Sequence, residues 1–265
     1  MRSAVAVGFY PSSKEELEKV VRHYLISDKK INALGAIVPH AGYQFSGHVA
    51  GATLKAAKTD KKSFVLFGPN HTGYGSAVSV SNEDWGTPLG IVKTDKELVK
   101  RIGLGFDELA HQAEHSLEVQ LPFLQILYKD FSIVPIALRD VGFEQLEEIA
   151  KLFDKNSFYI ASSDFTHFGP MYGYEPVAGT IKEQINWVKE IETGLIDLIT
   201  KLKAKEFYNT ILDNGYTVCG FVPITLLMLI MKSLGAKKGE LIKRATSYEV
   251  SRDSSFVSYV GLVFS

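Results

Sequence analysis

Short apolar runs alternate with amphipathic segments along most of the chain. Continuous apolar runs, typical of strands buried on both faces, occur at residues 33–38, 63–67, 132–138 and 157–161. The segments between them repeat apolar residues with helical spacing, which predicts helices at residues 46–57, 94–102, 116–128 and 143–153. An earlier helix begins after Ser13, which has capping-box spacing to Glu16, and Thr94 has the same spacing to Glu97. This alternation predicts an α/β fold with a mostly parallel sheet flanked by helices.

The last third of the chain is helical first and extended at its end. Amphipathic or apolar segments predict helices at residues 180–202, 207–212 and 220–234. Residues 241–250 and 256–264 predict two strands joined by a polar turn, a hairpin that would add antiparallel strands to the sheet. No stretch rich in proline, glycine and serine is long enough for a linker, so we predict one domain over residues 1–265.

The charge balance narrows the possible partners. Lysines and arginines number 29 and aspartates and glutamates 30, which gives a net charge of −1. The chain therefore lacks the positive charge on which binding to nucleic acid or to an anionic membrane depends, and we expect neither partner. No apolar run reaches the ~20 residues that a membrane-spanning helix needs, and the first residues do not resemble a signal peptide. We expect a cytoplasmic protein.

Three predicted strands each end close to a histidine. His40 follows the first buried strand, His71 follows the second, and His167 follows the strand predicted at residues 157–161. The carboxyl ends of parallel strands lie together in an open α/β sheet, and ligands bind in the crevice outside them. Each histidine alone is more often a hydrogen-bonding loop residue, but three at equivalent strand ends indicate a shared site. Imidazoles on rigid strand ends are suitable metal ligands.

The only cysteine, Cys219, stands directly before an apolar helix. A single cysteine excludes an internal disulfide and a zinc site made of thiolates alone. A position at a helix amino terminus favours the thiolate, which with two of the histidines would form a three-ligand metal site with open positions. The alternative is that Cys219 is a small buried apolar side chain.

A second histidine pattern offers a rival interpretation. The segment His111-Gln-Ala-Glu-His115 fits the H-x-x-E-H pattern of zinc peptidases, with Glu114 as the general base. The third zinc ligand would then come from a downstream glutamate, for which Glu144, Glu147 and Glu148 are available. The interpretation that we favour is that His115 and Glu118 begin the helix at residues 116–128 and face the same pocket as the strand-end histidines.

At these residues the chain resembles the Memo family, the Memo-like component of the AmmeMemoRadiSam system of archaea and bacteria. The resemblance is carried by segments in one order along nearly the whole chain: Gly8-Phe9-Tyr10-Pro11, Val38-Pro-His-Ala-Gly-Tyr43, Gly68-Pro-Asn-His-Thr-Gly73, Glu114-His-Ser-Leu-Glu118, Ser162-Ser-Asp-Phe-Thr-His167 and Cys219-Gly220. It implies the fold of class III extradiol dioxygenases, a central mixed sheet flanked by helices. Those enzymes bind Fe(II) through two histidines and a glutamate and use another histidine as acid and base.

The resemblance also implies roles for particular residues. His40 and His71 match the metal histidines, and Cys219 stands where the dioxygenases have the metal glutamate. Asp164 and His167 match the remaining pocket residues, so we expect His167 to be the acid and base and Asp164 to orient it or to bind substrate. Fe(II) is the expected metal, but a thiolate also raises affinity for copper and zinc.

Three functions remain open. The first is a redox enzyme with a non-haem iron site; it gains support from Tyr43, Phe45, Tyr74, Phe165 and Phe168, which adjoin the ligand motifs and would form aromatic walls. The second is a non-catalytic protein that binds a peptide, a small molecule or a partner protein of the AmmeMemoRadiSam system in the inherited pocket. The third is a zinc hydrolase.

Overall fold

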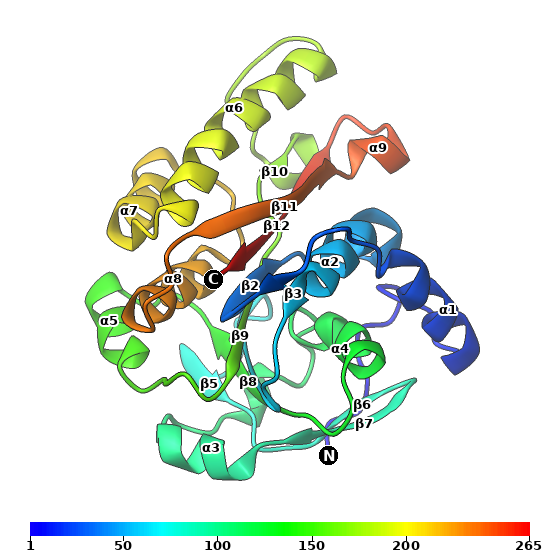
Figure 1. Ribbon diagram of the computed structural model, residues 1–265. Helices are drawn as coiled ribbons and strands as arrows, with labels where there is room; N and C mark the ends of the chain where they lie inside the picture. The colour runs from blue at the N-terminus through cyan, green and yellow to red at the C-terminus, as the bar shows by residue number, and fades with distance from the viewer.

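A ten-stranded mixed sheet forms the centre of the computed structural model, which describes residues 1–265 (Figure 1). The strand order is β10 (His167–Phe168), β12 (Phe256–Phe264), β2 (Gly35–Val38), β9 (Phe158–Ser162), β4 (Ser63–Pro69), β8 (Ser132–Leu138), β7 (Gly90–Thr94) and β6 (Trp85–Thr87). The strands from β2 to β7 in this order run parallel to one another. The α/β fold with a mixed sheet is therefore confirmed, and β2, β4, β8 and β9 are the strands that the apolar runs predict.

The two faces of the sheet each pack against a layer of helices (Figure 1). One face is covered by α3 (Lys96–Ile102), α5 (Phe143–Ala150), α6 (Ile181–Thr200), α7 (Ala204–Asn214) and α8 (Phe221–Ser233), which share a core cluster of 37 buried residues with it. The other face packs against α1 (Lys14–Tyr24), α2 (Tyr43–Ala56) and α4 (Leu121–Leu127) in a cluster of 24.

Strand β4 shows why the sequence pattern was continuous instead of alternating. Val65 and Phe67 belong to the larger core cluster, whereas Phe64 and Leu66 belong to the smaller one. Successive side chains of a strand point to opposite faces, so a strand covered by helices on both sides needs apolar residues at every position.

The carboxyl-terminal hairpin extends the sheet with antiparallel strands, as predicted. Strand β12 pairs with β11 (Gly239–Thr246) along one edge; along its other edge it pairs with β10 near its start and with β2 near its end. The predicted strand at residues 241–250 ends early, at Thr246, and a short helix α9 (Tyr248–Ser251) follows. At the end of the strand the Glu249 side chain accepts the Thr246 N–H at 3.0 Å, and the Ser247 N–H still bonds to the Val257 carbonyl of β12 before α9 begins.

Three local predictions were wrong. The helix predicted at residues 116–128 is a 3₁₀ turn η2 (Glu118–Gln120) followed by α4, because the Ser116 N–H is bonded to the Glu114 carboxylate and Pro122 opens the α-helix. Helix α3 is capped by Asp95, which accepts the Leu98 N–H, and not by Thr94. Several short strands were also missed: β1 (Ile31–Asn32), β3 (Ala57–Lys58), β5 (Val78–Val80), β6, β7 and β10.

Ser13 caps α1 as predicted, with its hydroxyl accepting the Glu16 N–H. No helix of the chain combines the length and the apolar character needed to cross a bilayer.

Candidate metal centre

The carboxyl ends of β2, β4 and β9 open into one cavity of about 570 Å³. His40 and His71 each follow the end of their strand by two residues, and His167 lies beyond the loop that leaves β9. All three histidines line the cavity, together with His115 and Asp164. The common position of these histidines at strand ends therefore brings them together, as the sequence predicts.

Three candidate ligands converge beside this cavity, and two of them, His40 and His71, belong to its lining. One ligand atom each from His40, His71 and Cys219 lies within 4.8 Å of the other two, and His40 Nε2 is 3.4 Å from Cys219 Sγ. The His40 Nδ1 is 3.1 Å from the Ser162 hydroxyl, and the His71 Nδ1 is 3.0 Å from a Glu114 carboxylate oxygen. Both rings thus use Nδ1 for a fixed hydrogen bond, which leaves Nε2 for a metal.

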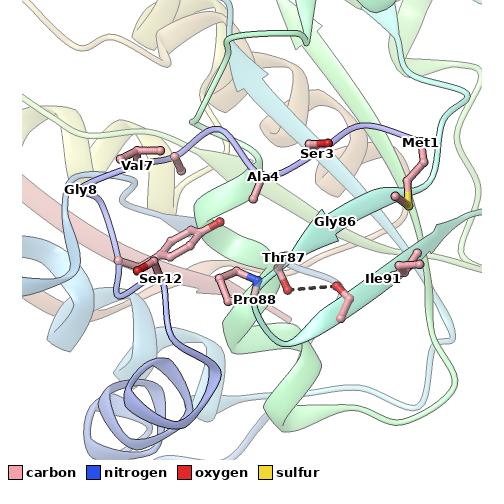
Figure 2. A pocket seen from close by; sticks show the side chains of 13 residues that line it. Met1, Ser3, Ala4, Val7, Gly8, Ser12, Gly86, Thr87, Pro88 and Ile91 are labelled. Atoms are coloured by element: carbon pink, nitrogen blue, oxygen red, sulfur yellow. Dashed lines mark hydrogen bonds between the residues drawn. The ribbon is translucent and has the colours of Figure 1, made fainter.

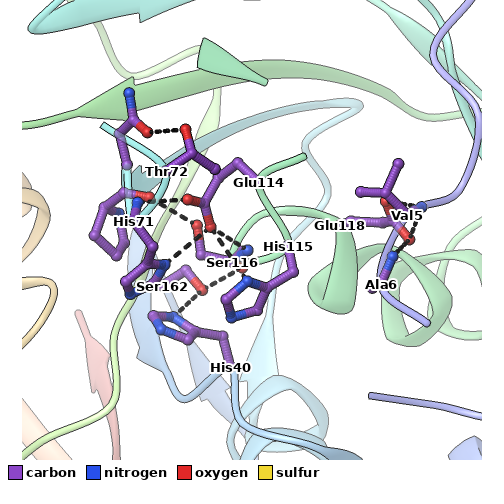
Figure 3. A network of polar contacts seen from close by, with 12 residues as sticks. Val5, Ala6, His40, His71, Thr72, Glu114, His115, Ser116, Glu118 and Ser162 are labelled. Carbon is purple, nitrogen blue, oxygen red and sulfur yellow. Dashed lines mark hydrogen bonds and ion pairs between the residues drawn. The ribbon is translucent and has the colours of Figure 1, made fainter. Parts of the chain in front are cut away.

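Glu114 is the residue of this centre whose role the sequence analysis missed. Its carboxylate accepts hydrogen bonds from the backbone N–H of His71 at 2.5 Å and from the Nδ1 of the His71 ring. It also accepts a hydrogen bond from the Ser116 N–H at 2.8 Å (Figure 3). Burial alone would raise the pKa of Glu114, but these hydrogen bonds and the charge on His71 lower it to about 2. Its signals in the sequence were its place beside His115, which we interpreted as part of a zinc-peptidase motif, and its position in a segment that carries the family resemblance.

The same contacts set the charge of His71. Burial alone would lower the pKa of this ring, but its hydrogen bonds to Cys219 and Glu114 and their charges raise the pKa to about 10. Burial lowers the pKa of His40 well below its usual range, and the neighbouring His71, His115 and His167 act in the same direction. The two candidate ligands therefore differ: the pKa of His71 is raised and that of His40 is lowered.

Opposing effects act on the pKa of the Cys219 thiol, for which the sequence predicts the thiolate. Burial raises the pKa of this thiol, the charge of Asp164 adds to the effect, and the hydrogen bond from His71 offsets it only in part. Cys219 does lie just before α8, but loss of solvation opposes the charged form of the thiol there. The place itself is tightly fixed, since a Cβ on the next residue, Gly220, would lie 2.5 Å from that of Ser163.

His115 lies where the sequence analysis expected it, but Glu118 does not. The His115 ring stacks on Phe9 at 4.1 Å and on His71 at 5.0 Å between ring centroids, and burial lowers its pKa to about 4. Glu118 is fully buried on the far side of its turn, where it accepts the N–H groups of Val5 and Ala6 (Figure 3). It does not line the cavity, and its role is to hold the amino-terminal segment.

The H-x-x-E-H interpretation was also wrong. Residues 111–115 form no helix, so the two histidines do not share a helical face. His111 is buried beneath Trp85, with its Nε2 3.1 Å from the Ser79 carbonyl oxygen, and is absent from the cavity. The zinc-peptidase site built on this motif is therefore excluded.

His167 and Asp164 both line the cavity, but they are oriented separately. The His167 Nδ1 lies 2.9 and 3.0 Å from the carbonyl oxygens of Phe165 and Thr217, which can only accept, so Nδ1 carries a proton and is held by these carbonyls. Asp164 instead accepts the N–H groups of His40 and Ala41 at 2.8 and 3.2 Å. Asp164 thus does not orient His167 by a hydrogen bond, and burial raises its pKa.

The aromatic walls of the cavity are mostly not those expected. Phe165 and Phe168 are fully buried in the core, Tyr43 is buried with its hydroxyl on the Val119 carbonyl, and Tyr74 is exposed outside the cavity. The aromatic residues that do line it are Phe9, Phe45, Tyr172 and Tyr259.

A larger hollow of about 740 Å³ lies between the amino-terminal segment and the turn joining β6 to β7 (Figure 2). Its lining has no charged side chain, and the hydroxyl of its tyrosine, Tyr10, donates to Glu118. The groups that could carry out chemistry are therefore concentrated in the histidine cavity.

Comparison with known proteins agrees with the resemblance read from the motifs. A family model described as Memo-like protein matches residues 2–263. A MEMO1 family protein of Methanosarcina barkeri is 39% identical, with 98% of each chain covered. Another from Pyrococcus abyssi is also 39% identical, covering 98% of this chain and 97% of its own. The chain therefore belongs to the Memo-like family.

Proposed function

We propose that this protein holds one metal ion through His40, His71 and Cys219 and uses it for a redox reaction on a small, largely apolar substrate. Fe(II) is the metal that we propose first, with copper or zinc as alternatives. The observation that carries the proposal is the convergence of two imidazoles and a thiol, with the other nitrogen of each ring already bonded to Ser162 or Glu114.

The spacing of the donors supports this proposal. Ligand bonds of about 2.0–2.1 Å to nitrogen and about 2.3 Å to sulfur place the two donor atoms about 3.1–3.6 Å apart for angles between octahedral and tetrahedral. The 3.4 Å between His40 Nε2 and Cys219 Sγ falls in this range. Two imidazoles and one anionic ligand also leave open positions, which is typical of non-haem iron sites.

The surrounding residues would handle the substrate and its proton. When bound, the metal would supply open coordination positions and a change of oxidation state. Because two carbonyls hold the His167 Nδ1, the Nε2 is the nitrogen that would exchange a proton with a substrate hydroxyl in the cavity. The rings of Phe9, Phe45, Tyr172 and Tyr259 would hold an apolar or aromatic group and exclude water.

The metal content of protein purified without oxygen tests the ligand set. We expect about one metal ion per chain in the wild type and a strong loss in His40→Ala, His71→Ala and Cys219→Ser. His48→Ala is the matched control, because this half-buried histidine of α2 does not line the cavity. His167→Ala should keep the metal. Undiminished metal in Cys219→Ser would contradict the proposed ligand set.

Oxygen consumption by Fe(II)-loaded protein tests the reaction. Catechols and simple phenols are the first substrates to try, beside ester and peptide substrates assayed with zinc-loaded protein. We expect turnover only with iron and oxygen, and its loss in His167→Ala. Hydrolysis supported by zinc without any redox response would contradict the proposal. Binding of a ligand that persists without metal, with no turnover, would favour a binding protein.

A further inference from the structure

A buried arginine near the amino terminus donates hydrogen bonds to the backbone of the segment that carries Glu114. Arg2 is only 6% exposed, and its guanidinium lies 3.9 Å over the Trp85 ring. Its Nε donates to the His111 carbonyl at 2.7 Å, and its Nη2 donates to the Glu114 carbonyl at 2.6 Å. The planar fork of arginine can reach both carbonyls from one position, which a lysine cannot do.

The position of Arg2 is itself fixed by Glu118. The Arg2 Nη1 donates to the Glu118 carboxylate at 2.5 Å, and neither side chain is more than 5% exposed. The same carboxylate accepts the N–H groups of Val5 and Ala6 and the Tyr10 hydroxyl. The guanidinium therefore has little freedom to move relative to the turn that contains Glu118.

The contacts continue from this arginine to two rings of the candidate metal centre. Glu114, whose backbone Arg2 holds, accepts hydrogen bonds from both the backbone and the ring of His71. The amino-terminal segment also supplies Phe9, which stacks on His115. The orientation of His71 thus depends on a carboxylate whose backbone is fixed from the other end of the chain.

We propose that Arg2 is a positioning residue of the metal centre: it fixes the backbone of Glu114 so that the Glu114 carboxylate can orient the His71 ring. The proposal rests on the proposed function only in that His71 is taken to be a metal ligand. The first test of the role of Arg2 needs no metal, so this proposal and the proposed function can fail separately.

Nuclear magnetic resonance of the metal-free protein is that first test. The proton on His71 Nδ1, assigned by its absence in His71→Ala, should appear downfield and exchange slowly because it is bonded to Glu114. We expect this signal to be lost in Arg2→Met. Arg2→Lys keeps the positive charge next to Glu118, so the chain should fold. A lysine cannot donate to both carbonyls at once, so we expect the His71 signal to be shifted or broadened.

Arg244→Met is the matched control. Arg244 pairs with the fully buried Glu192 at 2.5 Å, and that carboxylate holds the Thr166 N–H near His167, away from His71. This variant should lower the melting temperature but leave the His71 signal unchanged. The affinity for Co(II), measured with tags kept off the amino terminus, should fall roughly 10–100-fold in Arg2→Lys and less than about twofold in Arg244→Met.

Two results would overturn the proposal. One is a wild-type protein without a bonded His71 Nδ1 proton. The other is an unchanged His71 signal in Arg2→Lys, which would mean that Arg2 serves only the stability of the fold. If the wild type binds no metal at all, the proposed function fails, but the metal-free spectra still decide the role of Arg2.

Discussion

Glu118→Gln separates a structural role of this carboxylate from the catalytic role that its sequence motif suggested. The substitution keeps the shape of the side chain and removes its charge. In the folded protein one carboxylate accepts hydrogen bonds from Arg2, from the N–H groups of Val5 and Ala6, and from the Tyr10 hydroxyl. A glutamine has one acceptor oxygen, so its amide N–H₂ must face at least one of these donors.

The size of the effect follows from burial. Glu118 is fully buried and Arg2 almost so, and removing one partner of a buried ion pair costs about 3–5 kcal/mol because the other charge stays unpaired. This is a large part of the roughly 5–15 kcal/mol that stabilises a typical domain. With a urea slope of about 3 kcal/mol/M, the unfolding midpoint should fall by about 1–1.7 M.

Urea unfolding followed by circular dichroism measures this change. Glu83→Gln is the control, since Glu83 pairs with the amino terminus at 3.4 Å but is 43% exposed, and we expect a change within about 0.5 kcal/mol. A Glu118→Gln protein of wild-type stability that had lost activity would refute the structural role and return Glu118 to the catalytic residues.

Three further outcomes follow from the geometry. Gly220→Ala should destabilise the protein by about 1–3 kcal/mol, because the added Cβ would clash with the end of β9. Gly194→Ala lies at an exposed helical position with open space and should stabilise the protein by about 0.5–1 kcal/mol in the same urea titrations. His111→Asn should leave the metal content unchanged, since this ring lies outside the cavity. In the metal-free protein the pKa of His71 is raised, so its charged form adds stability below about pH 6.5, and this stability is lost as the pH rises towards 10. In Glu114→Gln the free energy of unfolding, measured across this pH range, should fall less steeply.

The fold could be predicted because its signals are local. Continuous apolar runs mark strands with helices on both faces, and β4 distributes its residues over two core clusters accordingly. The convergence of His40, His71 and His167 followed from the same reasoning, because parallel strands present their carboxyl ends at one edge.

The errors concern side chains whose partners are distant in sequence. The partners of Glu118 lie more than 100 residues away, in a segment that no spacing rule connects to it. Phe165 adjoins Asp164 in sequence but points into the core, whereas Phe9 reaches the cavity from the other end of the chain. Spacing predicts which residues share an element, but only the packed structure determines the direction of each side chain.

X-ray absorption spectroscopy of the iron-loaded protein identifies the atoms bound to the metal and so decides whether Cys219 is a ligand. We expect nitrogen scatterers of the imidazole type from His40 and His71 and one sulfur scatterer at about 2.3 Å from Cys219. Cys219→Ser should remove the sulfur scatterer, and His48→Ala should leave the spectrum unchanged. A wild-type spectrum with only oxygen and nitrogen neighbours would contradict the claim that Cys219 is a ligand of this centre.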